Sequence, residues 1–335
     1  MRSEAMSPDQ ILEGTRTYKV TVVVPAYNSA ATLPRALKSL QAQTSSDFCV
    51  LVIDDGSNEE MLELMPDDPR FFGHRLHRNQ GYAAVTNHAL DMSASTWVLF
   101  LDSDDSLDPE CIEVLVARGE AENSDFVVLP HKTFEPTGSV SVHGIVATTS
   151  PVPAGRALRH FIDGRVHPNQ HHLFRPNHVR AKPNTYSDLG FIVNLLATMS
   201  TVSFEPRPMY NYFLLSDSVT AQLSERIWDL ATVLDDFEGA LRTMYIGREA
   251  VEAIHRMRWT QLNYMLSKAA GDTSSPRLKS DVYFWCRNEI RFSHVVDALR
   301  TRQAARGFSM ALARVAPRTH SYAYRLRGSL KERWL

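Results

Sequence analysis

The sequence is short of cysteine and has no long apolar run. Its three cysteines, Cys49, Cys111 and Cys286, lie far apart and form no C-x-x-C pair. So sparse a set predicts no disulfide framework and favours a reducing compartment, the cytoplasm. No apolar run approaches the roughly 20 residues of a membrane-spanning helix, and the opening stretch MRSEAMSPDQILEG lacks the apolar core of a secretory signal. We therefore expect a cytoplasmic protein without a membrane span, which leaves contact with the inner face of a membrane open.

The chain also lacks a strong net charge. Its formal charge is −2 at pH 7, which argues against a nucleic-acid-binding protein. The charge is uneven, however, because residues 300–335 hold eight Arg and one Lys against a single Glu. Within this basic tail, Ala304, Phe308, Leu312 and Val315 fall on one helical stripe. We expect the stripe to pack within its domain or against a second copy of the chain, with peripheral membrane contact as the alternative.

Strand and helix patterns alternate over the first part of the chain. The apolar runs VTVVV, FCVLVI, TWVLFL and SDFVVLP are separated by segments with apolar residues at helical spacing. This alternation predicts an α/β fold with a doubly wound, mostly parallel sheet, which binds its ligand at the carboxyl ends of the strands. We expect a loose N-terminus over 1–17, an α/β domain over 18–225 and a helical C-terminal domain with the basic tail over 226–335.

Four aspartates crowd the end of one predicted strand, in TWVLFLDSDDSLDP. Residues Asp102 to Asp105, which we call the acid turn, include three of them, and Asp108 follows. Carboxylates this close raise one another's pKa values unless a cation balances them. Asp102 and Asp104 form a D-x-D pair, whose oxygen ligands suit Mg²⁺ or Mn²⁺ together with a diphosphate. Asp108 and Pro109 are expected to begin the next helix.

Two other kinds of site also use a D-x-D pair. A calcium loop that starts at Asp102 would need glycine at its sixth position, where the chain has Leu107, and a preceding helix rather than a strand. A phosphatase or phosphotransferase of the haloacid-dehalogenase type carries its D-x-D after the first strand, whereas at least two strand–helix units precede Asp102. Both alternatives stay open, but they fit the chain less well than a metal and diphosphate site.

A second acidic strand end, VIDDGSN, carries Asp54 and Asp55. A carboxylate at this place can accept a hydrogen bond from a base or a ribose, although Asp, Gly, Ser and Asn equally favour a turn or a helix cap. Together with PAYN and DSDD, it gives three strands that end in polar residues. Because the carboxyl ends of parallel strands meet at one edge, this order favours a nucleotide-binding crevice.

Four segments in this order resemble family 2 inverting glycosyltransferases of the GT-A fold: VTVVVPAYNSAATLPRALKSLQAQ, VLVIDDGSN, NQGYAAVTNHAL and WVLFLDSDDSLDP. The resemblance covers residues 19–130 and continues more weakly to about residue 225. It implies a nucleotide-sugar half at 18–130 and an acceptor half at 131–225. The implied nucleotide-sugar site consists of Pro25, Ala26, Tyr27, Asn28, Asp55, Asn79, Gly81, Asp102 and Ser103, with Asp104 and Asp102 as ligands of Mn²⁺ or Mg²⁺.

The resemblance implies that Asp188, in YSDLGF, is the catalytic base. An inverting transfer needs one base to take the proton of the acceptor hydroxyl. Without the resemblance, an aspartate here would more often be a first-turn acid of a helix. The implied acceptor or phosphate contacts are His171, His172, Arg175 and Ser218.

The chain departs from the pattern of the resembling family at several positions. Ser187 precedes Asp188 where the family commonly has Glu, and Thr86 and Phe213 stand where it often has Arg. These changes affect the expected acceptor and phosphate contacts more than the overall activity. Zinc is not expected at His171 and His172, because successive side chains of a strand point to opposite faces.

The resemblance, together with these motifs, implies a glycosyltransferase of the hexosyl or N-acetylhexosaminyl type. It would move a sugar, with inversion, from a nucleotide diphosphate sugar to a hydroxyl of a glycan, a cell-wall polymer or a lipid-linked acceptor. A uridine diphosphate sugar is the favoured donor. The alternative is a non-catalytic nucleotide-sugar-binding module, because the Glu expected before Asp188 is missing.

Overall fold

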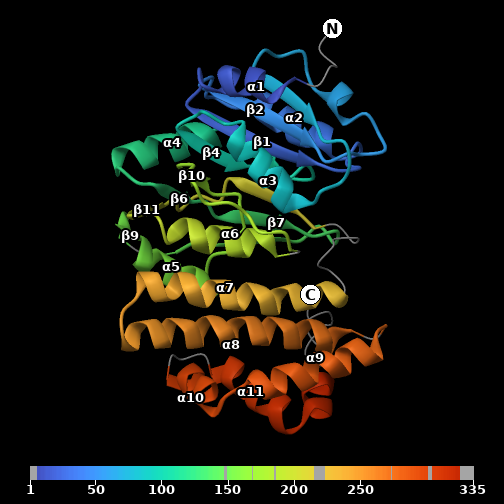
Figure 1. The fold of residues 1–335 in the computed structure, drawn as a ribbon, viewed down its shortest axis with the longest axis vertical. Coiled ribbons are helices and arrows are strands. Elements are labelled where there is room, and N and C mark those ends of the chain that lie inside the picture. Colours follow the sequence, from blue (N-terminus) through green and yellow to red (C-terminus); the bar gives the residue numbers. More distant parts are fainter. Residues whose placement is uncertain are drawn as a thin grey trace. The chain divides into compact units, whose positions relative to one another are not determined.

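The fold is known from a computed structural model, which describes residues 6–146, 149–167, 169–184, 186–214, 223–272, 274–300 and 304–324. The chain divides into two compact units. The first consists of residues 1–161 and 165–215, and the second of residues 162–164 and 216–335. Figure 1 shows sheets and helices in the first unit, and helices over the described residues of the second.

An eight-stranded sheet forms the centre of the first unit (Figure 1). Its strands, in spatial order, are β3 (Phe71–Arg75), β2 (Phe48–Asp54), β1 (Val20–Ala26), β4 (Trp97–Phe100), β10 (Leu173–Phe174), β6 (Phe126–Val128), β11 (Thr201–Phe204) and β9 (Val152–Pro153). The first four run parallel, whereas β10 is antiparallel to both of its neighbours and β9 is antiparallel to β11. The predicted α/β fold with a mostly parallel sheet is confirmed.

The strands of this sheet are apolar on both faces. Every residue of β2 and β4 is buried, as in parallel strands with helices on both sides. The helices of this unit are α1 (Pro8–Thr15), α2 (Leu33–Gln41), α3 (Tyr82–Asp91), α4 (Cys111–Ala121), α5 (Ala154–Ile162) and α6 (Ser187–Leu196), with a 3₁₀ turn at Met61–Leu64. Helix α2 buries Leu33, Ala36, Leu37 and Leu40, at the spacing of one helical face, in the core around β1 and β2.

A second, four-stranded sheet brings β12 next to the acid turn. Its order is β5 (Ser106–Leu107), β12 (Tyr210–Phe213), β7 (His131–Phe134) and β8 (Val140–His143). Strand β5 begins directly after the acid turn and pairs antiparallel with β12, with Tyr210 opposite Leu107. The second sheet therefore places a late strand of the unit against the end of β4.

Asp108 joins two strands of the second sheet. Its carboxylate oxygens accept hydrogen bonds from Lys132 Nζ at 2.7 Å and from Asn211 Nδ2 at 2.8 Å. Helix α4 begins at Cys111, whose N–H donates to the Asp108 carbonyl. The expectation that Asp108 and Pro109 begin the helix is corrected, because the Asp108 side chain binds β7 and β12 instead of a free helix end.

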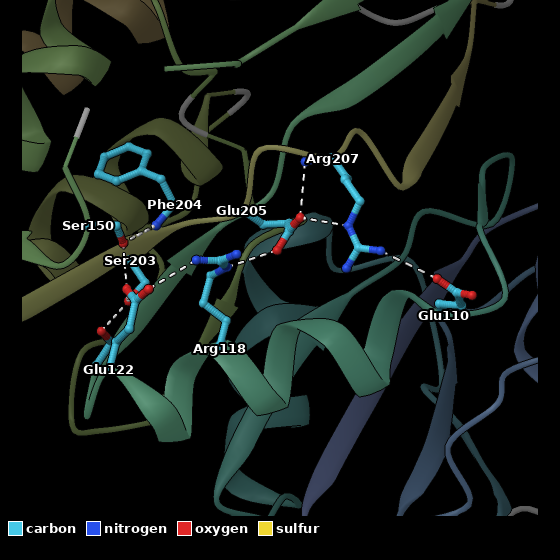
Figure 2. Close-up of polar contacts among 9 residues, drawn as sticks. Glu110, Arg118, Glu122, Ser150, Ser203, Phe204, Glu205 and Arg207 are labelled. Carbon is cyan, nitrogen blue, oxygen red and sulfur yellow. Dashed lines mark hydrogen bonds and ion pairs between the residues drawn. The ribbon is translucent and has the colours of Figure 1, made fainter. Parts of the chain in front are cut away.

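A chain of ion pairs fixes the segment that leads into β12 (Figure 2). Arg118 of α4 contacts Glu122 at 3.0 Å and Glu205 at 2.8 Å. Arg207 contacts Glu205 at 3.0 Å and Glu110 at 3.4 Å. The Glu205 side chain is only 1% exposed, so two guanidinium groups balance its charge in place of water. The network attaches the residues between β11 and β12 to α4.

The N-terminal stretch that we expected to be loose forms helix α1. Ser7 and Gln10 cap its start reciprocally: Ser7 Oγ accepts the Gln10 N–H, and Gln10 Oε1 accepts the Ser7 N–H at 3.0 Å. The Thr15 hydroxyl at its end donates to the Met92 carbonyl at 3.2 Å. The expectation for residues 7–17 is therefore wrong, because caps and a tertiary hydrogen bond order this segment.

The second unit consists of helices over its described part. They are a 3₁₀ turn at Glu225–Trp228, α7 (Asp229–Met244), α8 (Arg248–Gly271), α9 (Pro276–Glu289), α10 (Phe292–Arg300) and α11 (Ala304–Val315). None of the helices in the described ranges has the length and apolarity needed to cross a membrane. On α11, Met310 and Ala313 are buried, whereas Phe308 and Val315 are 68% and 78% exposed. Among the described residues, Phe308 and Val315 of the expected stripe are therefore exposed and Leu312 is half-buried, and contact with a membrane or a second copy stays a prediction.

Candidate active site

The ends of three strands bring the polar motifs to one edge of the main sheet. Strand β1 pairs in parallel with both β2 and β4, so the three strands end on the same side. Tyr27 follows β1, Asp55 follows β2 and the acid turn follows β4. Parallel register therefore produces the convergence that the sequence predicted.

Asn28 shapes the loop after β1. Its φ of 48° lies in the left-handed region, which asparagine tolerates better than most residues. Its N–H donates to Ser57 Oγ at 2.9 Å, and its Oδ1 accepts the N–H of Asn58 at 2.9 Å. Tyr27 is 49% exposed, so its ring has the access that stacking on a base requires. Pro25 and Ala26 are the last residues of β1, and Asn79 lies in the loop before Gly81.

Asp55 holds the loop before α3 through both carboxylate oxygens. They accept the N–H groups of Gln80 at 2.7 Å and Gly81 at 2.9 Å. Gly81 has a φ of 85°, which glycine adopts at least cost. Asp55 therefore has a structural task that the sequence did not predict. Each carboxylate oxygen can accept a further hydrogen bond, so the contact with a base or ribose stays a prediction.

Two tyrosines fix the acid turn. Tyr82 Oη donates to Asp102 Oδ1 at 3.1 Å. Tyr210 Oη donates to Asp105 Oδ2 at 2.7 Å and accepts the N–H of Asp102 at 3.3 Å. Asp105 is fully buried, and its second carboxylate oxygen accepts the N–H of Phe213 at 2.9 Å, so its side chain connects the turn to β12. Asp102 and Asp104, the D-x-D pair, are only partly buried, and ligand binding by them stays a prediction.

Burial and mutual repulsion raise the pKa values in the acid turn. Burial first, and then the charges of Asp104 and Asp188, raise the pKa of Asp102 to about 7. Burial and the charge of Asp102 raise the pKa of Asp105 to about 8. A nearby cation would reverse these shifts by favouring the ionised carboxylates. The acid turn therefore fits a divalent cation electrostatically.

The number of carboxylates also bears on the metal. In the described ranges, no group of three or more His, Cys, Asp or Glu side chains has the arrangement of a metal site. Mg²⁺ is commonly held by one or two carboxylates together with substrate phosphates and water. Asp102 and Asp104 match this mode, in which the diphosphate completes the coordination.

Asp188 lies in the first turn of α6, which contacts α3, the helix that begins at Tyr82. Its negative charge contributes to the raised pKa values of Asp102 and Tyr82. Its Oδ1 accepts the N–H of Leu189 at 2.8 Å. Burial raises the pKa of Asp188 to about 6. A carboxylate with this pKa is a stronger base than an ordinary aspartate and is still ionised at neutral pH.

The two candidate histidines are both buried. His172 Nδ1 accepts the N–H of Leu129 at 3.1 Å, so the neutral ring donates its Nε2 hydrogen to the His167 carbonyl at 3.1 Å. Both of its nitrogens are therefore occupied by the backbone, which leaves none for an acceptor. The ring centroid of His171 lies 4.4 Å from that of Tyr210, so His171 packs against the tyrosine that holds the acid turn.

Arg175 lies at the opposite edge of the main sheet. Its Cζ atom is 4.2 Å from the ring centroid of Trp97, the first residue of β4. Its Nε donates to the Ser124 carbonyl at 3.3 Å. Because the acid turn follows the last residue of β4, Arg175 is excluded from a phosphate site there. Ser218, the remaining candidate, lies outside the described residues.

The sequence analysis predicted no role for three side chains near the site. Tyr82 and Tyr210 hold the acid turn, and Asn87 joins α3 to the loop before α6. Asn87 Nδ2 donates to the Ala181 carbonyl at 2.9 Å, and its Oδ1 accepts the Ala181 N–H at 2.8 Å. The position of Tyr82, directly after a glycine at a helix start, was the one local hint.

The segment that builds the strand ends and the acid turn matches a known family. Residues 21–180 match the model of glycosyl transferase family 2. This family 2 segment contains the expected nucleotide-sugar residues and ends shortly before Asp188.

The proteins that are similar to the chain include two curated relatives and one solved structure. A cholesterol galactosyltransferase of Borreliella burgdorferi is 27% identical over 62% of this chain and 63% of that protein. A PGL/p-HBAD biosynthesis glycosyltransferase of Mycobacterium tuberculosis is 38% identical over 32% of this chain and 44% of that protein. The chain thus spans less than two thirds of either relative. TarS of S. aureus, solved with UDP-GlcNAc, is 16% identical, has a TM-score of 0.66 and covers 87% of this chain and 90% of its own. That likeness confirms the GT-A type of fold.

Proposed function

We propose that the chain is an inverting glycosyltransferase that moves a sugar from a nucleotide diphosphate sugar to a hydroxyl group. The observation that carries this proposal is the D-x-D pair at the shared end of the parallel strands β1, β2 and β4, with Asp188 on α6, a helix that contacts α3 at the same site. The reaction needs a proton acceptor and a site for diphosphate charge on either side of the reacting carbon. The family 2 segment and the GT-A fold support the same class.

In the proposed reaction, Asp188 takes the proton of the acceptor hydroxyl. The acceptor oxygen bonds to the anomeric carbon from the face opposite the diphosphate. The bond from that carbon to the diphosphate oxygen breaks, and its electron pair leaves with the nucleoside diphosphate. Attack from the opposite face inverts the configuration at the anomeric carbon.

Asp104 and Asp102 would hold Mn²⁺ or Mg²⁺, which supplies charge neutralisation to the departing diphosphate when it is bound. Tyr82 and Tyr210 orient the acid turn through their hydrogen bonds. Tyr27, with its exposed ring, would stack on the base, and Asp55 would bind the base or ribose. Pro25, Ala26, Asn28, Asn79, Gly81 and Ser103 would complete the pocket.

The proposed donor is a uridine diphosphate sugar of the hexosyl or N-acetylhexosaminyl type. The complex of TarS with UDP-GlcNAc supports this choice through the shared fold. The proposed acceptor is a glycan, a cell-wall polymer or a lipid-linked glycan.

A donor panel tests the function. Purified protein is incubated with UDP, GDP and dTDP sugars and Mn²⁺, and the released nucleotide is measured with and without candidate acceptors. We expect slow release from a UDP sugar alone, and faster release with a matching acceptor. If donors bind but no nucleotide is ever released, the chain is a nucleotide-sugar-binding module and the enzymatic proposal fails.

A further inference from the structure

Arg35 is a cation in direct contact with the acid turn. It lies on α2, and a guanidinium N–H donates to the carbonyl oxygen of Asp104. Its Cζ atom lies 3.8 Å from the centroid of the Phe213 ring. The guanidinium is therefore held between the two segments that border the D-x-D pair, the acid turn and β12.

Two packing features hold Arg35 in this place. Helix α2 is anchored by Leu33 and Leu37, which are buried on either side of Arg35 in the sequence. The Phe213 ring stacks on Phe134, with 4.9 Å between centroids and an interplanar angle of 15°. Arg35 thus covers the end of an aromatic stack. A guanidinium on an aromatic face keeps its N–H groups at its edge, where they can bind an anion.

Most of the hydrogen-bonding capacity of Arg35 is unused by the residues that the structure describes. An arginine side chain has five N–H donors, and among the described residues the Asp104 carbonyl is the one oxygen that accepts from Arg35. The side chain is exposed. The remaining donors can therefore reach a ligand at the D-x-D pair without breaking a contact within the protein.

The position of Arg35 also bears on one departure of the chain from the pattern of the family that it resembles. Phe213 stands where the resembling family often has an arginine. In the structure the Phe213 ring carries the guanidinium of Arg35 on its face. A positive charge is therefore present at this place, but it comes from α2 rather than from β12.

We propose that Arg35 binds the diphosphate of the nucleotide donor and supplies the positive charge that Phe213 does not. The inference rests on the proposed function, because it takes a nucleoside diphosphate as the ligand. The planar guanidinium presents paired N–H groups that match two phosphate oxygens. Its contact with the Asp104 carbonyl holds it beside the pair that would bind the metal.

The test compares UDP with uridine, which lacks the phosphates. Dissociation constants of both are measured with Mn²⁺ for the full chain, for Arg35→Ala and for Lys38→Ala, an exposed cation on the same helix. We expect Arg35→Ala to weaken the binding of UDP by about 10- to 100-fold, the range for charge-assisted hydrogen bonds. The affinity for uridine should not change. Lys38→Ala should bind both as the wild type does.

Two results would overturn the inference. Arg35→Ala could bind UDP as tightly as the wild type does. It could also bind both UDP and uridine more weakly by the same factor, which is expected if Arg35 has a purely structural role. Arg35→Lys keeps the charge but loses the planar guanidinium. Its affinity for UDP should lie between those of the wild type and Arg35→Ala, and its affinity for uridine should not change. If Arg35→Ala fails to fold, Arg35→Lys is judged by the same UDP and uridine criterion.

The wild type separates this inference from the proposed function. If the wild type binds none of UDP, GDP and dTDP, the proposed function fails and the inference fails with it. If the wild type binds UDP and the arginine variants do not differ from it, the inference alone is wrong.

Discussion

The hydroxyl of Tyr210 donates to the carboxylate of Asp105 at 2.7 Å, and both side chains are buried. The same oxygen accepts the N–H of Asp102 at 3.3 Å. One hydroxyl from β12 therefore connects the two ends of the acid turn. The turn is held in shape by a strand that is distant in sequence, so its geometry depends on the second sheet.

Tyr210→Phe should therefore loosen the acid turn. The buried Asp105 carboxylate would lose a hydrogen bond, which we expect to cost about 1–3 kcal/mol of unfolding free energy. Turnover of the donor should fall as well. Urea denaturation and nucleotide release measure the two effects. Tyr322→Phe, at an exposed tyrosine of the second unit, is the matched control, and an equal effect of both substitutions would contradict the role of Tyr210.

Asp188→Asn should abolish transfer while keeping nucleotide binding. Asparagine has nearly the same shape but cannot take a proton, so we expect a rate loss of about 10²- to 10⁴-fold. Nucleotide release and calorimetric UDP binding measure the two properties. Asp67→Asn, at an exposed aspartate, should leave both unchanged. Normal turnover by Asp188→Asn would remove this residue from the mechanism.

The rate should depend on pH through Asp188. Burial raises its pKa to about 6, and a general base must be deprotonated to act. We therefore expect kcat/KM to fall about tenfold for each pH unit below about 6, because the ionised fraction falls by that factor. A pH series of initial rates in the presence of Mn²⁺ checks this. A rate that stays constant from pH 7 to pH 5 would be incompatible with Asp188 as the base.

Removal of the metal should weaken binding of the donor. With EDTA the carboxylates of the D-x-D pair would repel the diphosphate, so the affinity of the wild type for UDP should fall. In Asp104→Ala, the affinity should be low with or without Mn²⁺, because a metal ligand is missing. Calorimetric titrations with UDP measure this difference, and Asp67→Ala serves as control. If the wild type binds UDP equally tightly with and without EDTA, the metal assignment is wrong.

His172 should contribute to stability at neutral pH and less in acid. Burial lowers its pKa to about 4 in the folded chain, against about 6.5 in an unfolded chain. The contribution is complete above pH 6.5 and is lost as the pH falls toward 4, because the unfolded state binds the proton first. The destabilisation caused by His172→Gln should thus shrink by up to about 3 kcal/mol between pH 7 and pH 4. Urea denaturation at several pH values measures it, and a constant difference would be the contrary result.

The strands that lead to the site could be read from the sequence. β1, β2 and β4 are continuous apolar runs that end in polar residues, a pattern set by burial on both faces. Helix α1 was also readable, because Ser7 and Gln10 stand at the spacing of a capping box. The expectation of a loose N-terminus relied on the polar composition of this segment and overlooked the capping box.

Other features had no local signal. Strand β10, which lies between β4 and β6, has two residues, too few to show a period. The role of Asp105 depends on Tyr210, 105 residues further along, and no spacing rule connects residues that far apart. The contact of Arg35 with Phe213 depends in the same way on the pairing of the second sheet.

The late place of β12 in the chain has a consequence for how the protein is made. Synthesis proceeds from the N-terminus, so β1, β2 and β4 leave the ribosome well before β12 does. During that interval the nascent chain carries the acid turn without the hydroxyl and backbone N–H groups that hold Asp105. The acid turn is thus among the last parts of its unit to reach its final structure, and a truncated chain that ends before residue 210 would lack the groups that hold it.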